Sequence, residues 1–149
     1  MNHMVGWIQV FDAGCHDRPL DGDAGTYQCG DDPAADFRAA AASLVAGWEK
    51  YGRDRKVRVT SGELPGPMVF DMTVMEYLTH GWDLAVATGQ PVRYTEQEAS
   101  DTLARAEAML PPEYRGDGMP FGHVVAIEAD APALNRLVAF LGRNPALPG

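Results

Sequence analysis

The stretch Met68-Val-Phe-Asp-Met-Thr-Val-Met-Glu-Tyr-Leu-Thr-His-Gly-Trp-Asp-Leu-Ala-Val-Ala-Thr88 decides how this sequence is read, because it predicts a long helix with one narrow polar stripe. At roughly 100° per residue, Thr73, Glu76, His80 and Asp83 fall on the same side of that helix. The flanking sides are largely apolar, so we expect the helix to be central and buried. Polar side chains in such a position need partners.

The rest of the chain predicts four more helices, and start and stop signals mark their ends. Asp32-Pro33 begins one helix, Thr95 with Glu98 forms a capping box for another, and Asp130 is expected to cap the last. The expected helices cover residues 1–13, 33–51, 95–110 and 130–142, with short strands at 56–60 and 124–128 and a turn at 61–67. The fold class is therefore mainly α, a helix bundle with a small hairpin or extended addition.

Length and composition limit the class of protein. The 149 residues suit a single domain over residues 1–149. There are 12 Lys and Arg against 21 Asp and Glu, a net charge of −9, which argues against nucleic acid or an anionic membrane as partner. Without an apolar membrane-spanning run or a signal peptide, we expect a cytoplasmic protein, with Cys15 and Cys29 as free, inert thiols.

Glu76 and His80 are four residues apart, so their side chains point the same way and could share one metal ion. The same spacing is also common on solvated helix faces, where the two residues form a modest stabilising pair. A metal site would need a third ligand from elsewhere. The candidates are His3, His16, His123 and the carboxylates. His3 could reach the bundle core if its helix packs beside the long one, and is otherwise solvated at a frayed end. The simplest interpretation of His16 is a surface residue, and that of His123 is a partly exposed loop residue.

Four segments resemble one protein family. They are Asn2-His-Met-Val-Gly-Trp7, Glu76-Tyr-Leu-Thr-His-Gly-Trp-Asp-Leu-Ala85, Ala108-Met-Leu-Pro-Pro112 and Ala131-Pro-Ala-Leu-Asn-Arg-Leu-Val-Ala-Phe-Leu-Gly-Arg143. They are similar to the DinB-like superfamily that includes mycothiol-dependent maleylpyruvate isomerase. The resemblance implies a four-helix bundle with one divalent metal, usually zinc, held by a histidine of the second helix and a later Glu-x-x-x-His pair.

Carried over residue by residue, the implied ligands are His3, Glu76 and His80. Two imidazoles and a carboxylate are suitable ligands for Zn²⁺, and also for Fe²⁺ or Ni²⁺. The implied activity uses mycothiol or a similar thiol, held on the metal as a thiolate, against a small electrophile, as in an isomerase or a transferase. Asp83 is the candidate catalytic residue that would orient His80, or else it makes an ordinary hydrogen bond between helices.

The resemblance also has a departure. Family members have a helix before the Asn2–Trp7 motif, so either the start of this chain is assigned late or the bundle is a shortened form. Without that helix the bundle exposes an apolar groove, and we expect either a homodimer in which a second copy covers the groove or a poorly stable monomer. The alternatives to an enzyme are a metal-binding or protein-interaction module without turnover, and a remnant with no metal.

Overall fold

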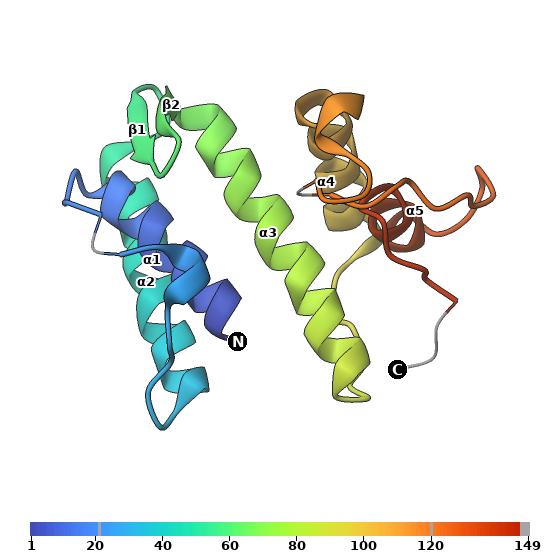
Figure 1. The fold of residues 1–149 in the computed structure, drawn as a ribbon, viewed down its shortest axis with the longest axis horizontal. Coiled ribbons are helices and arrows are strands. Elements are labelled where there is room, and N and C mark those ends of the chain that lie inside the picture. Colours follow the sequence, from blue (N-terminus) through green and yellow to red (C-terminus); the bar gives the residue numbers. More distant parts are fainter. Residues whose placement is uncertain (21, 120, 147–149) are drawn as a thin grey trace. The chain divides into compact units, whose positions relative to one another are not determined.

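The computed structural model describes residues 1–20, 22–119 and 121–146, and within them it is mainly helical (Figure 1). Among these residues the α-helices are α1 (Asn2–Cys15), α2 (Pro33–Tyr51), α3 (Gly66–Ala87), α4 (Glu96–Met109) and α5 (Ala133–Phe140). Two short 3-10 helices cover Ala24–Thr26 and Pro112–Tyr114, and the strands β1 (Lys56–Val59) and β2 (Gly62–Pro65) form a hairpin. The expected class, a helical fold with a small hairpin, is confirmed. Among the described residues, the structure contains no helix that could span a membrane.

The chain divides into two compact units, Met1–Thr73 and Val74–Gly149. Helix α3 contributes residues 66–73 to the first unit and 74–87 to the second.

In the first unit, α1 packs against α2 and against β1 (Figure 1). The buried apolar side chains of this unit include Val5, Ile8, Phe11, Leu44, Val57 and Val59. Helix α2 begins as expected, because the Asp32 side chain accepts a hydrogen bond from the Ala35 N–H. Where α1 approaches β1, a Cβ on Gly14 would lie 2.0 Å from the Arg58 carbonyl oxygen, so this close approach requires glycine.

The hairpin corrects one expectation from the sequence. Residues 61–67 were expected to be a turn, but Gly62–Pro65 form β2 and pair antiparallel with β1, with Val59 opposite Gly62. The turn is therefore reduced to Thr60 and Ser61, and Gly62 has a φ of 119° that suits glycine.

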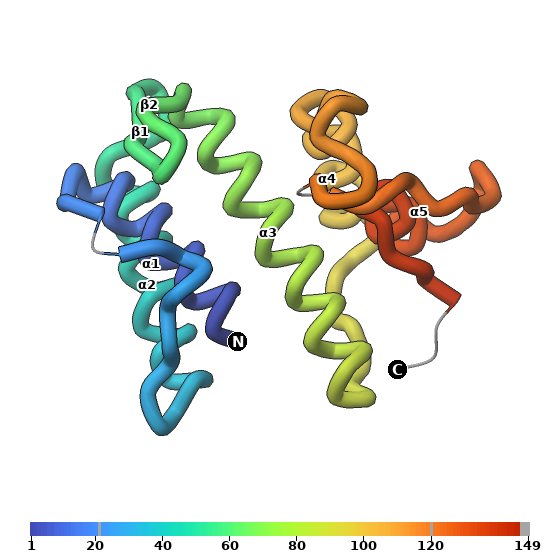
Figure 2. Tube along the Cα trace, viewed as in Figure 1, coloured from blue at the N-terminus to red at the C-terminus, as the bar shows by residue number. Residues whose placement is uncertain are grey.

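In the second unit, α4 packs against α5, and Figure 2 traces the long segment that leaves α4 and returns to α5. The core is one buried cluster from three helices: Met75 and Leu78 of α3, Leu103 and Ala106 of α4, and Leu137 and Leu141 at the end of α5. Helix α4 has the expected capping box, in which Thr95 and Glu98 each accept a hydrogen bond from the other's backbone N–H.

Asp130 was expected to cap the last helix, and this is wrong. Pro132 stands at the N-cap of α5 and gives no side-chain hydrogen bond. The Ala133 N–H instead donates to Glu96 Oε1 at 2.7 Å, so a carboxylate in the first turn of α4 closes the start of α5.

The strand expected at residues 124–128 is also wrong. These residues belong to no strand. The Val125 N–H donates to the Ala139 carbonyl at 2.9 Å, so this backbone group bonds to the end of a helix rather than to a neighbouring strand.

The two cysteines are free thiols, as expected. Burial raises the pKa of Cys15, against the opposing effect of Arg55, while Cys29 is half-buried. A raised pKa leaves less thiolate at neutral pH, so we expect a disulfide reagent to label one thiol per chain quickly and Cys15 only after unfolding. A Cys29→Ser variant should lose the fast phase, and fast labelling that persists in this variant would contradict the prediction.

We expect Gly14→Ala to lower the free energy of unfolding by about 2 kcal/mol, because the new methyl group must push α1 away from β1. Chemical denaturation followed by circular dichroism measures the change. Gly30→Ala is the matched control, since a Cβ there meets its nearest atom at 3.5 Å. Equal stability of the two variants would show that the approach at Gly14 is not tight.

Candidate functional site

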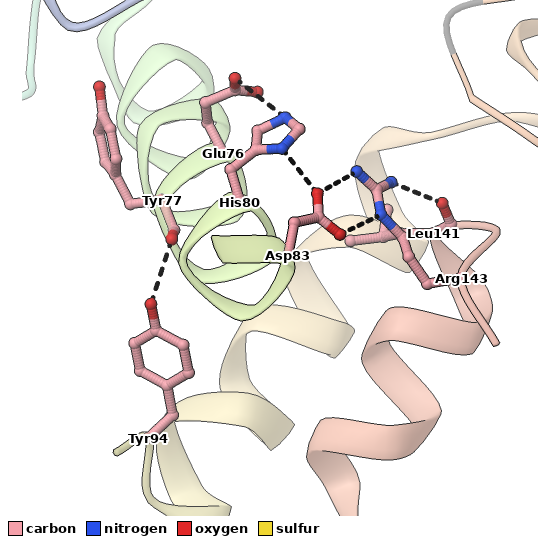
Figure 3. A network of polar contacts seen from close by, with 7 residues as sticks. All are labelled: Glu76, Tyr77, His80, Asp83, Tyr94, Leu141 and Arg143. Carbon is pink, nitrogen blue, oxygen red and sulfur yellow. Dashed lines mark hydrogen bonds and ion pairs between the residues drawn. The ribbon is translucent and has the colours of Figure 1, made fainter. Parts of the chain in front are cut away.

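Three residues of the polar stripe on α3 lie in one continuous line of contacts (Figure 3). Glu76 Oε1 is 3.3 Å from His80 Nε2, and His80 Nδ1 is 2.8 Å from Asp83 Oδ2. The side chains are half-buried, with exposed fractions of 18% for Glu76 and 25% for His80. Glu76 and His80 are therefore not a fully solvated helix pair, and the sequence-predicted grouping on one helix side is confirmed.

Asp83 is fixed from a second direction by Arg143. The guanidinium donates from Nη2 to Asp83 Oδ2 at 2.8 Å and from Nε to Oδ1 at 3.1 Å, a two-point contact (Figure 3). Burial alone would raise the pKa of Asp83, but hydrogen bonds from His80 and Arg143, with the Arg143 charge, lower it to about 2. Asp83 is therefore a carboxylate at neutral pH.

The ionised state of Asp83 determines which nitrogen of His80 holds the proton. A carboxylate only accepts hydrogen bonds, so His80 Nδ1 carries the proton and donates it. A metal binds only the neutral ring, whose lone pair is then on Nε2, the nitrogen next to Glu76. This is the arrangement in which a histidine is prepared to coordinate a metal through Nε2.

The separation of Glu76 Oε1 and His80 Nε2 also fits a shared ion. Two ligand atoms that are each about 2.1 Å from a tetrahedral zinc lie about 3.4 Å apart. The observed distance is 3.3 Å. The donor atoms, an imidazole nitrogen and a carboxylate oxygen, are ones that Zn²⁺ accepts.

The third sequence-predicted ligand, His3, belongs to the other compact unit, in the first turn of α1. It is exposed, and its ring meets Trp7 edge-on with centroids 6.4 Å apart. Asn2 links this first turn to the following loop. Its Nδ2 donates to Gln28 Oε1 at 2.8 Å, and its Oδ1 accepts from the Cys29 N–H at 3.2 Å. The role of His3 stays a prediction.

The other two histidines have different surroundings. His16 was expected to be a surface residue in a loop, but it follows α1 directly and is half-buried, with Nε2 3.2 Å from both Asp12 Oδ1 and the Ser43 carbonyl. Those contacts give it a structural role in the first unit. His123 lies in a loop, and 79% of its side chain is exposed.

A tyrosine packs against α3 at Gly81, the residue that follows His80 in the sequence. Tyr94 donates a hydrogen bond from its hydroxyl to the Tyr77 carbonyl at 3.2 Å (Figure 3). A Cβ on Gly81 would lie 1.9 Å from that hydroxyl oxygen, so Gly81 leaves the space that Tyr94 occupies. This contact gives a physical reason for glycine next to His80 in the middle of a helix.

Arg143 is the site residue that sequence reasoning missed. It lies 60 residues after Asp83, and its placement depends on the packing of α5 rather than on helical spacing. The only sequence signal was local, a Gly142-Arg143 pair after an apolar helix, which marks a helix end and names no partner.

Comparison with known proteins gives a family match. Residues 8–85 match the mycothiol maleylpyruvate isomerase N-terminal domain. Two uncharacterized proteins of Mycobacterium tuberculosis, from strains H37Rv and CDC 1551, are each 37% identical over 93 residues, which is 62% of this chain and 51% of theirs. The matched stretch thus spans about half the length of these curated relatives. No solved structure matches.

The contact between Gly81 and Tyr94 gives a test by paired substitutions. We expect Gly81→Ala to lower the free energy of unfolding by about 2 kcal/mol, because the methyl group meets the tyrosine hydroxyl. A Tyr94→Phe background removes the hydroxyl and leaves ring atom Cζ 3.1 Å from the new methyl group. There the same change should be nearly neutral, because the preference of a helix for alanine over glycine, about 1 kcal/mol, offsets the remaining contact. Urea denaturation of the four proteins measures this difference. An equal cost in both backgrounds would contradict it.

Proposed function

The chain belongs to the family of the mycothiol maleylpyruvate isomerase N-terminal domain, and from this premise we propose that it is a metal-dependent protein of thiol chemistry. The proposed ligands of a divalent ion, Zn²⁺ in the first instance, are His3, Glu76 and His80. The observation that carries the proposal is the state of His80, whose Nδ1–H is held by Asp83 while Nε2 lies 3.3 Å from Glu76 Oε1. Fe²⁺ and Ni²⁺ suit the same three ligands.

The protein's own side chains have distinct tasks in this proposal. Asp83 holds the proton at His80 Nδ1, and so keeps the ring in one tautomer and orientation. Glu76 supplies a negatively charged oxygen one helical turn away. Three protein ligands leave a coordination position open, which is typical of a catalytic metal site. A divalent ion bound there would lower the pKa of a thiol and favour its thiolate, the nucleophilic form.

The reaction class we propose is that of a thiol-dependent isomerase or transferase, with mycothiol or a similar small thiol as cosubstrate. The family match supports the thiol, since the matched family is named for a mycothiol-dependent activity. The electrophilic substrate and the homodimer stay predictions from the sequence. Asp83 acts here through His80, so it is a positioning residue and not a group that meets the substrate.

Metal content is the direct test. We expect purified protein reconstituted with Zn²⁺ to hold about one ion per chain by elemental analysis, and His80→Ala to lose it because one of three ligands is removed. His123→Ala is the matched control, because that histidine is exposed in a loop and should leave the metal content unchanged.

The outcomes separate the alternatives. An absence of bound metal after reconstitution would contradict the proposal. Metal that is retained in His80→Ala would contradict the ligand assignment. Metal binding that depends on His80, combined with no consumption of thiol in the presence of electrophiles, would favour a metal-binding module without turnover.

A further inference from the structure

The C-terminal segment reaches the proposed metal ligand through two hydrogen-bonded side chains. Arg143 contacts both oxygens of Asp83, and Asp83 accepts the Nδ1 proton of His80 (Figure 3). Arg143 lies outside the stretch of residues 8–85 that matches the family, whereas Asp83 and His80 lie within it. The residue that fixes the line of contacts therefore comes from a part of the chain to which the family match assigns nothing.

The end of α5 determines where Arg143 lies. The Gly142 N–H donates to the Ala139 carbonyl at 3.1 Å, and the Arg143 N–H donates to the Val138 carbonyl at 2.8 Å. With φ of 85° at Gly142, these two bonds form a Schellman motif, which ends the helix and fixes the direction of the next residue. A Cβ on Gly142 would also lie 3.1 Å from Gly122 Cα. Both the positive φ and this close approach therefore favour glycine at this position.

Packing places this helix end beside α3. Leu137 and Leu141 share one buried cluster with Met75 and Leu78, so the end of α5 is held against the helix that carries His80. Arg143 is further fixed by its own Nη1, which donates to the Leu141 carbonyl at 2.8 Å. All three nitrogens of the guanidinium therefore have an acceptor, and about a quarter of the side chain is exposed.

A guanidinium fork fixes both the position and the plane of the carboxylate it binds, which a single point charge does not. Asp83 Oδ2 accepts from Arg143 Nη2 and from His80 Nδ1, each at 2.8 Å. Without the fork, the Asp83 side chain could rotate, and the imidazole would lose the acceptor that selects its tautomer.

We propose that Arg143 is a positioning residue for His80: by clamping Asp83 in one plane, it keeps the His80 proton on Nδ1 and directs Nε2 toward the proposed metal. This inference rests on the proposed function for its metal, but the tautomer of His80 is a property of the protein alone. The two parts can therefore be tested separately.

The experiment compares wild type with Arg143→Gln, Arg143→Lys and the control Arg136→Gln, which removes a charge from α5 itself without touching Asp83. Long-range ¹H–¹⁵N spectra of the metal-free proteins, recorded over a pH series that ends with the His80 ring neutral, report which ring nitrogen keeps its proton. Competition with a chromophoric chelator then gives the Zn²⁺ affinity of each protein. Far-ultraviolet circular dichroism checks that α5 is retained.

We expect wild type and Arg136→Gln to have His80 in the Nδ1–H form, and Arg143→Gln to have a mixture of tautomers. The affinity for Zn²⁺ should fall by about 10- to 100-fold in Arg143→Gln. Arg143→Lys should recover part of the loss, because a lysine keeps the charge but not the two-point contact.

An unchanged tautomer together with unchanged Zn²⁺ affinity in Arg143→Gln would overturn the inference. If Arg143→Gln loses helix content, Arg143→Lys decides: wild-type tautomer and affinity in that variant would overturn the need for a fork. If wild type binds no Zn²⁺, the proposed function fails, while the tautomer spectra still accept or reject the role of Arg143.

Discussion

The carboxylate of Asp83 is the constraint on which the candidate site depends. It receives three hydrogen bonds from two elements, one from His80 on its own helix and two from Arg143 beyond α5. A half-buried, ionised carboxylate needs charged or strongly polar partners, and His80 and Arg143 are such partners. The state of the imidazole, and through it the direction of Nε2, follows from that one group. The distance between Glu76 Oε1 and His80 Nε2 fits a shared ion only while Asp83 holds the imidazole in this orientation.

The part of the site that a single helix determines could be predicted from the sequence. Glu76, His80 and Asp83 are four and three residues apart, and helical geometry places such residues on one side whatever else the protein does. Arg143 could not be predicted in this way. Its contact with Asp83 spans 60 residues and depends on apolar packing between α3 and α5, which spacing along the chain does not reveal.

The same distinction explains the errors in the fold. The capping box at Thr95 was predictable because both of its partners lie within one helical turn. The cap of α5 was not, since its acceptor, Glu96, is 37 residues away. The sequence of residues 124–128 is typical of a strand, but a strand also needs a neighbouring strand to pair with. The Val125 N–H donates to the Ala139 carbonyl instead. Local patterns thus predicted elements well and their polar partners poorly.

The distance along the chain between Asp83 and Arg143 has a consequence during protein synthesis. Chains grow at about 5 to 20 residues per second, so the arginine follows the aspartate out of the ribosome by about 3 to 12 s. Helix α5 has only eight residues and is too short to be stable by itself, so it forms on a partner already present. For those seconds α3 exists with its acidic residue unclamped. In the nascent protein the imidazole of His80 is thus held differently than in the finished one, and this state ends when Arg143 can reach Asp83.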